Sequence, residues 1–324
     1  MGGVARVAAI DCGTNSLRLL VADLPDDGGA RAPLIDVVRR MEIVRLGQGV
    51  DRTGGLAPEA IERTRVALAD YAAQIDSLGV ECIRMVATSA TRDAANADDF
   101  RAMVLDTLGA APEVVTGEEE AKLSFTGAVR GLPPQTEPPY LVVDIGGGST
   151  EFVLGSGTVE HAASVDIGCV RMTERHLHDD PPTSGQIRAA EADVTEAVDR
   201  ALAVVPGQSA RTLVGLAGSV TTVTALALGL DRYDPARIHH ARVSYAEVAK
   251  VTADLLAMTK AQRLALAGMH PGRADVIGAG ALVLRVVMER VGADSVVASE
   301  HDILDGIAWS LLNPPNLVGQ RGGI

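Results

Sequence analysis

Aromatic residues are scarce in this sequence: they make up 2% of its 324 residues, with one Trp, four Tyr and three Phe. The hydrophobic cores therefore have to be built from Val, Leu, Ile and Ala. Hydrophobic residues account for 47% of the chain, which is ordinary for a globular protein, and the length allows two domains. Runs rich in Val and Ile alternate with Ala-rich segments of helical pattern, which predicts an α/β protein.

Cysteine is also rare. Cys12, Cys82 and Cys169 stand singly in apolar segments, without any C-x-x-C spacing. An odd number of isolated cysteines favours buried thiols in a reducing compartment over disulfides or a zinc site. The sequence has no signal-peptide pattern at its start and no apolar run long enough to cross a bilayer, so we expect a cytoplasmic protein with no membrane partner.

Positive charge is in deficit, with a formal net charge of −13. This argues against a general nucleic-acid binder, because such proteins need a basic face. An anionic substrate remains compatible, because a few arginines and a bound metal can set the local field. The motifs of P-loop enzymes, serine hydrolases and zincins are absent as well, which argues against those three classes.

The most informative segment is 141–154, LVVDIGGGSTEFVL. Its apolar start predicts a buried strand. Gly146, Gly147 and Gly148 allow the backbone to turn sharply and to direct several N–H groups at an anion. Asp144 and Glu151 bracket this loop with carboxylates, the ligands that Mg²⁺ prefers when phosphate oxygens complete its shell. The segment predicts a phosphate-binding loop with a metal at its mouth; the alternative is a plain glycine-rich hairpin turn.

The same pattern occurs a second time, at residues 7–24, VAAIDCGTNSLRLLVADL. Asp11 aligns with Asp144, Gly13 with Gly146, and Ser16 with Ser149, without a gap. Two copies far apart in the chain indicate two similar domains and not a short-period solenoid. Two such loops facing each other would hold a polyphosphate from both sides.

A further candidate lies in the segment ATSATRDAAN, residues 87–96. We expect Thr91 to cap a helix that carries Arg92 in its first turn and runs to Gly109. A cation in a first turn opposes the helix dipole, whereas an anion bound there would reverse the effect. Arg92 is therefore a phosphate-binding candidate, and a surface ion pair with Asp93 or another acid is the alternative.

Three other arginines also lie near such loops. Arg18 is two residues beyond Ser16 on the same strand face, and Arg171 lies in the turn DIGCVRMTE at 166–174. Each faces either the phosphate site or the solvent. Arg273 precedes an apolar helical segment and is a further substrate-binding candidate.

The segment TGEEEA, residues 116–121, predicts the start of a helix. Thr116 fits an N-cap, and a Thr-x-x-Glu capping box would turn the side chain of Glu119 back to it. A glutamate of this turn that lies close to the substrate could orient and deprotonate a water. The proline-rich connector GLPPQTEPP follows at 131–139, so we place a first domain at residues 1–133, a second at 134–312 and a loose tail at 313–324.

Together the motifs DCGTNSLRL, ATSATRDAAN, TGEEEA, DIGGGSTE and RADVIGAGALVL resemble those of the exopolyphosphatase and guanosine pentaphosphate phosphohydrolase family. The resemblance covers nearly the whole chain. It implies two actin-like (ribonuclease H-like) domains with a central cleft, and a helix near residues 302–312 that returns to pack on the first domain. Longer members carry an additional helical domain with histidine and aspartate motifs; we expect a short form without it, in which dimerisation could restore the lost surface.

The resemblance also implies roles for individual residues. Glu120 would be the catalytic base. Asp144, Glu151 and Asp11 would be the metal-side carboxylates, with Mg²⁺ as the ion and Mn²⁺ as its alternative. The phosphate-binding set would be Asn15, Ser16, Arg18, Arg92, Gly146, Gly147, Gly148 and Ser149.

The expected reaction is release of terminal orthophosphate from inorganic polyphosphate by metal-assisted attack of water. Three alternatives stay open. The substrate could be guanosine pentaphosphate, the protein could sense guanosine tetra- or pentaphosphate without hydrolysing it, or it could be an actin-like sugar kinase. The last usually has an aspartate as base and lacks the TGEEEA helix.

Overall fold

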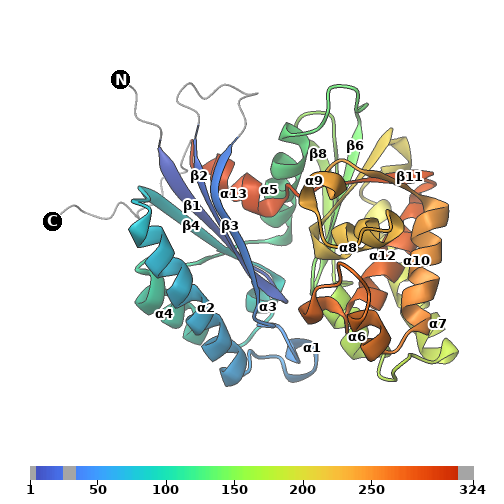
Figure 1. Cartoon of the computed structure of the whole chain (residues 1–324), viewed down its shortest axis with the longest axis horizontal. Coiled ribbons are helices and arrows are strands. Elements are labelled where there is room, and N and C mark those ends of the chain that lie inside the picture. Colours follow the sequence, from blue (N-terminus) through green and yellow to red (C-terminus); the bar gives the residue numbers. More distant parts are fainter. Residues whose placement is uncertain (1–4, 25–33, 313–324) are drawn as a thin grey trace. The chain divides into compact units, whose positions relative to one another are not determined.

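The computed structural model describes residues 5–24 and 34–312. The chain forms two compact units, residues 1–131 with 303–324, and residues 132–302. Each unit is built on one β-sheet with helices packed against it, so the α/β class expected from the sequence is confirmed (Figure 1). The second unit ends at Asp302 and not at residue 312, and the predicted tail 313–324 lies outside the described residues.

The sheet of the first unit has the strand order β3-β2-β1-β4-β5. Its strands are β1 (Arg6–Cys12), β2 (Ser16–Asp23), β3 (Ile35–Ile43), β4 (Cys82–Ala87) and β5 (Glu113–Val114). Strands β1 to β3 form an antiparallel meander, whereas β4 runs parallel to β1 and β5 parallel to β4. Residues 7–24, the second copy of the loop pattern, lie in a β-hairpin of β1 and β2, and its turn places Asp11 opposite Arg18.

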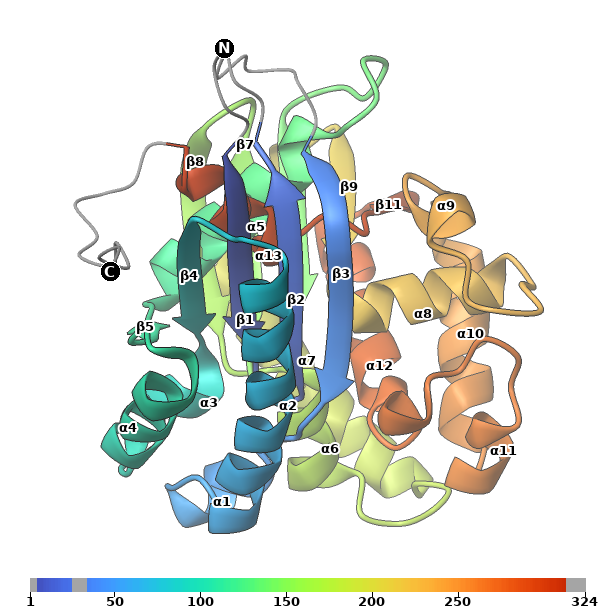
Figure 2. The same cartoon turned by 60° about the vertical axis from the view of Figure 1, so that its left-hand side comes forward.

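Helices cover both faces of this sheet (Figure 2). Helices α2 (Pro58–Ser77) and α4 (Ala97–Leu108) pack on one face, and α5 (Gly117–Arg130) and α13 (Ile303–Ser310) on the other. Alternate residues of β1 therefore enter different cores: Ala8 and Ile10 face α2, whereas Val7 and Ala9 face α13. Burial of both faces explains why β1 reads as a continuous apolar run.

Helix α13 comes from the end of the chain and packs against α5. Gly306 allows this approach, because a Cβ there would overlap the backbone of Leu123. The Arg39 guanidinium donates to Asp305 at 2.6 Å, and the Arg130 guanidinium lies 4.2 Å from the Trp309 ring centroid. These contacts assign α13 to the first unit.

The second unit repeats the plan with a sheet of order β10-β11-β9-β6-β7-β8. Its strands are β6 (Tyr140–Ile145), β7 (Thr150–Gly155), β8 (Val159–Val165), β9 (Thr212–Leu216), β10 (Arg242–Ser244) and β11 (Ser295–Ala298). Strands β6, β7 and β8 form the antiparallel meander, and β9 and β11 continue in parallel from β6. Strands β1, β2 and β3 of the first unit therefore correspond to β6, β7 and β8 here.

The helices of this unit share one hydrophobic core with its sheet. They are α6 (Cys169–His176), α7 (Ser184–Leu202), α8 (Ala217–Ala227), α9 (Pro235–Ile238), α10 (Tyr245–Ala257), α11 (Lys260–Leu264) and α12 (Ile277–Val291). Helix α12 packs against α6, α7, α8 and α10 and is buried along most of its length. No helix within the described residues has both the length and the apolar character needed to span a bilayer.

Two sequence predictions about this framework are wrong. Thr91 does not cap a long helix: a short helix α3 (Ser89–Arg92) carries Arg92 in its last turn, and α4 starts only at Ala97. Asn96 interrupts the helix, because its amide binds the Leu56 backbone N–H and C=O at 2.8 and 3.1 Å. Cys82 is exposed at the start of β4, whereas Cys12 and Cys169 are buried.

Candidate active site

The glycine loop of the second unit, residues 146–148, is oriented by the start of α6. The N–H groups of Cys169, Val170 and Gly168 donate to the carbonyls of Gly146, Gly147 and Gly148 at 2.9, 2.9 and 3.1 Å. The first N–H groups of a helix have no partner inside the helix, so they are available for this purpose. Carbonyl and N–H point in opposite directions across a trans peptide, so the N–H groups of Gly147, Gly148 and Ser149 point away from α6. Such a row of N–H groups can form an anion-binding nest.

Gly168 makes this approach of α6 to the loop possible. A Cβ at this position would overlap the backbone of Gly147 and Gly148. We did not identify Gly168 from the sequence. The available signal was a glycine immediately before a helix in the turn DIGCVRMTE.

The loop of the first unit is held in the same way by the segment that follows β3. The N–H groups of Val44 and Arg45 donate to the Asn15 carbonyl at 3.1 and 2.9 Å, and Gly47 donates to the Thr14 carbonyl at 2.9 Å. A Cβ on Gly47 would overlap the Thr14 side chain, so Gly47 corresponds to Gly168. The N–H groups of Asn15 and Ser16 therefore point away from this segment.

Two carboxylates, Asp144 and Glu151, lie opposite each other across β6 and β7. Directly opposed residues project from the same face of a sheet, and both side chains are buried, with residue exposures of 7% and 1%. Glu151 accepts a hydrogen bond from the Ser164 hydroxyl at 2.7 Å. Like charges in this position repel each other, so a cation bound between them would be stabilising.

This pair fits the chemistry of Mg²⁺, which is typically held by one or two carboxylates while phosphate and water oxygens complete the shell. Within residues 5–24 and 34–312, no group of three or more His, Cys, Asp or Glu side chains is arranged to hold a metal ion. The third predicted carboxylate, Asp11, lies in the first unit. There the Arg18 Nε and Nη2 atoms donate to Asp11 Oδ2 at 2.9 and 2.6 Å.

Helix α5 carries the candidate base. Thr116 caps it as predicted and accepts a hydrogen bond from the Glu119 N–H at 3.2 Å. Glu120, in the first turn, is 8% exposed, and its Oε2 accepts a hydrogen bond from Arg92 Nη1 at 3.1 Å. The same Nη1 atom donates to the Val115 carbonyl at 3.0 Å. Burial singles out Glu120 among the three glutamates of this turn.

The other two glutamates have different surroundings. Glu118 is exposed and pairs with Lys122 at 2.9 Å. The Glu119 carboxylate lies 3.7 Å from the Arg84 guanidinium, and the predicted capping box is not formed. The reason is that the side chain of Glu119 is drawn to a cation of the neighbouring strand β4 instead of turning back to Thr116.

Arg273 lies elsewhere in the second unit, in a 3-10 turn (Pro271–Arg273) that precedes α12. Its Nη1 atom is 3.4 Å from the Gly218 carbonyl and 3.3 Å from the Thr222 hydroxyl, at the start of α8. Gly218 has no Cβ, and this leaves room for the guanidinium. The described contacts place Arg273 beside the β9–α8 turn.

Two buried cysteines lie next to the loops. Cys12 directly precedes the first loop, and burial together with the charge of Asp11 raises the pKa of its thiol. Burial likewise raises the pKa of Cys169, whose N–H binds Gly146. Both thiols therefore stay protonated and are poor nucleophiles at neutral pH.

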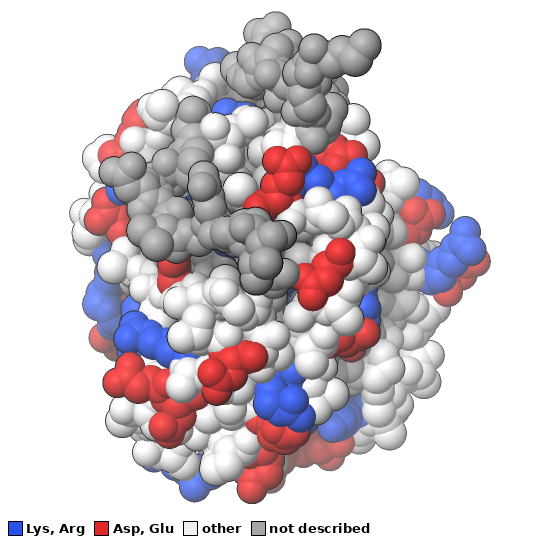
Figure 3. All heavy atoms as spheres, turned by 90° about the vertical axis from the view of Figure 1, so that its left-hand side faces the viewer, with Lys and Arg blue, Asp and Glu red and all other residues white. Residues whose placement is uncertain are grey.

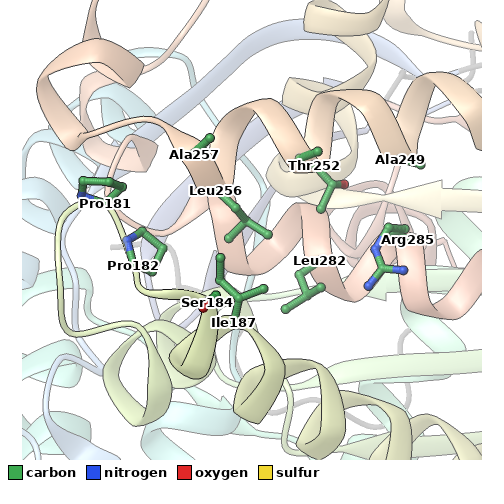
Figure 4. A pocket seen from close by; sticks show the side chains of 11 residues that line it. Pro181, Pro182, Ser184, Ile187, Ala249, Thr252, Leu256, Ala257, Leu282 and Arg285 are labelled. Atoms are coloured by element: carbon green, nitrogen blue, oxygen red, sulfur yellow. The ribbon is translucent and has the colours of Figure 1, made fainter.

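A cavity of about 490 Å³ lies between α7, α10 and α12 of the second unit (Figure 4). Ile187, Leu256 and Leu282 give it a mainly apolar wall, and none of the predicted site residues lines it. Because the guanidinium of Arg285 on its wall is engaged by Glu191 and Glu289, this cavity is poorly suited to a polyanion.

Several basic side chains on the surface of the described residues are paired with acids. Figure 3 shows Lys and Arg side chains interspersed with Asp and Glu on the face that it views. Arg65 pairs with Glu62 and Arg40 with Asp70, each at 2.7 Å.

Comparisons with known proteins agree on one family. A model described as the Ppx/GppA phosphatase family matches residues 26–314. Exopolyphosphatase 2 of Mycobacterium tuberculosis is 56% identical over 317 residues, which cover 95% of this chain and 99% of that protein. A solved exopolyphosphatase-like protein aligns with a TM-score of 0.91 at 45% identity, over 95% of this chain and 97% of its own. The Ppx/GppA enzyme of Aquifex aeolicus aligns with a TM-score of 0.79 at 32% identity, over 95% of this chain and 100% of its own.

Proposed function

Since the chain belongs to the Ppx/GppA phosphatase family, we propose that it is an exopolyphosphatase, which hydrolyses the terminal phosphoanhydride bond of inorganic polyphosphate and releases orthophosphate. Membership also assigns the two-sheet architecture to the actin-like fold of these enzymes. The observation that carries the proposal is the position of Glu120: it is buried in the capped first turn of α5 and bonded to Arg92 at 3.1 Å.

This arrangement suits attack by water on a phosphorus atom. Phosphoryl transfer has a loose transition state, so positioning and charge neutralisation account for most of the catalysis. Glu120 orients a water in line with the terminal phosphorus and accepts its proton as the new P–O bond forms; the bridging P–O bond breaks, and the shortened chain leaves with the bridging oxygen. Arg92 holds the carboxylate in place and adds positive charge near the equatorial oxygens.

Each unit has one loop that can bind phosphate oxygens. The N–H groups of Gly147, Gly148 and Ser149 bind phosphate oxygens on the second unit, and those of Asn15 and Ser16 do so on the first. Asp144 and Glu151 would hold Mg²⁺, or alternatively Mn²⁺, which when bound neutralises charge on the phosphate oxygens. The 5′ terminus of guanosine pentaphosphate presents the same phosphoanhydride group, so it is the alternative substrate.

The test is phosphate release in the presence of Mg²⁺ from short polyphosphate, long polyphosphate, guanosine pentaphosphate and ATP. We expect hydrolysis of polyphosphate, and a loss of about 10²- to 10⁴-fold in Glu120→Gln with the fold retained. Glu118→Gln is the matched control, because Glu118 is exposed and pairs with Lys122 on the same helix. A preference for guanosine pentaphosphate would reassign the substrate. Tight binding of guanosine pentaphosphate with no hydrolysis of any substrate would show that the protein is a sensor and not an enzyme.

A further inference from the structure

We propose that Arg171 is a positioning residue for phosphoryl transfer, which fixes the orientation of the Gly148 peptide so that the loop N–H groups face the phosphate. This inference rests on the proposed function. Arg171 lies in the first turn of α6, the helix whose start supports the glycine loop. The sequence left open whether this side chain faces the site or the solvent.

Arg171 contacts the loop twice. Its Nε atom donates to the Gly148 carbonyl at 2.8 Å, and its backbone N–H donates to the Gly147 carbonyl at 3.1 Å. The Gly148 carbonyl also accepts from the Gly168 N–H at 3.1 Å. A carbonyl oxygen has two lone pairs, so these two donors satisfy it fully and set its direction.

The loop needs this external restraint. Glycine occupies both halves of φ/ψ space almost equally well, so three successive glycines do not define one conformation by themselves. Rotation of the peptide between Gly148 and Ser149 would turn the Ser149 N–H away from the phosphate and point a carbonyl oxygen at it. A charge-assisted bond from a guanidinium is stronger than one from a neutral donor, and it opposes this rotation.

Charge adds to the effect. The guanidinium stays protonated across the physiological pH range, so it places a permanent positive charge beside the nest. The carboxylates of Asp144 and Glu151 lie on the strands that flank the same loop, where they favour release of an anion. A fixed cation next to Gly148 offsets part of that repulsion.

The experiment compares Arg171→Ala and Arg171→Lys with the unchanged chain in phosphate release from polyphosphate with Mg²⁺. Lysine keeps the charge but lacks the Nε–H donor, so both variants should lose activity. We expect a fall in kcat/KM of about 100-fold in Arg171→Ala, the effect of losing one oriented N–H donor. Millimolar guanidinium chloride should restore part of the activity of Arg171→Ala and leave Arg171→Lys unchanged.

Arg175→Ala is the matched control, because Arg175 lies one turn further along α6 and pairs with Asp193 at 2.9 Å. Its activity should equal that of the unchanged chain. Wild-type kcat/KM in Arg171→Ala, or a loss that guanidinium does not relieve, would overturn the inference and leave the proposed function intact. If the unchanged chain hydrolyses nothing, calorimetric binding of tripolyphosphate decides: weaker binding by both Arg171 variants than by Arg175→Ala supports the inference, and equal binding rejects it.

Discussion

Asp11 is ion-paired with Arg18 across strands β1 and β2, with Arg18 Nη2 2.6 Å from Asp11 Oδ2. The corresponding positions of the second unit hold Asp144 and Glu151, which face each other across β6 and β7. The same loop is thus repeated with the charge opposite the aspartate reversed. The first copy neutralises its aspartate with an arginine, whereas the second copy brings two carboxylates together, and this is the basis for expecting Mg²⁺ there.

This difference predicts the effect of Mg²⁺ on stability. A ligand that binds only the folded state raises the melting temperature, so Mg²⁺ should stabilise the unchanged chain and EDTA should reverse this. Glu151→Gln removes one of the two opposed charges and should abolish the shift. Glu160→Gln, an exposed position on β8, should keep it. Equal shifts in both variants, measured by calorimetry, would show that the metal binds elsewhere.

Gly168→Ala tests the support of the glycine loop. The added methyl group overlaps the backbone of Gly147, so the loop has to move. A displacement of about 1 Å in a catalytic site can lower the rate about 100-fold, and we expect a loss of that order in phosphate release. Gly157→Ala is the control, because no atom lies within 4 Å of its added Cβ and full activity should remain. An active Gly168→Ala protein would mean that the loop tolerates the shift.

Thr116→Ala tests the start of the helix that carries Glu120. Loss of the hydroxyl leaves the Glu119 N–H without its cap, which should lower the free energy of unfolding of this unit by about 1 kcal/mol. Thr126→Ala serves as comparison: the Thr126 hydroxyl bonds to the Lys122 carbonyl within the helix, so no cap is lost and no destabilisation is expected. Urea unfolding of the two variants measures the difference, and identical midpoints would contradict it.

His240 predicts a pH dependence of stability. Its ring lies 3.6 Å from that of His239, centroid to centroid, and the His239 ring lies 4.4 Å from that of His301. Burial, and beyond it the charge of His301, lowers the pKa of His240 below its ordinary 6.5. The unfolded chain therefore binds the proton more readily, so this contribution to stability is complete above about pH 6.5 and is lost as the pH falls through the lowered pKa.

His240→Asn should remove this contribution, and asparagine tolerates the left-handed backbone at φ 64°. We expect the fall in melting temperature between pH 7.5 and pH 5.5 to be smaller in His240→Asn than in the unchanged chain. His178→Asn, at an exposed position, should leave that fall as it is. A fall of the same size in His240→Asn would mean that other groups account for the acid sensitivity.

Local patterns in the sequence were sufficient to predict much of the secondary structure. The apolar run that begins at Leu141 predicted the buried strand that the structure shows as β6, because this signal depends on residues next to each other in the chain. The N-cap Thr116 was likewise predicted from the residues of the same helical turn. The prediction of one long helix starting at Thr91 was wrong, because the Asn96 side chain binds the backbone of Leu56, which lies far away in the sequence.

The sequence by itself determined that two similar loops exist and that glycines, hydroxyls and carboxylates are gathered in them. Only the tertiary structure decided which partner each charged group has: Arg18 binds Asp11, Arg92 binds Glu120, and Arg171 binds the Gly148 carbonyl. The physical reason is that glycine freedom and strand periodicity act within a few residues, whereas an ion pair forms between whichever side chains the packing of distant segments brings within about 3 Å.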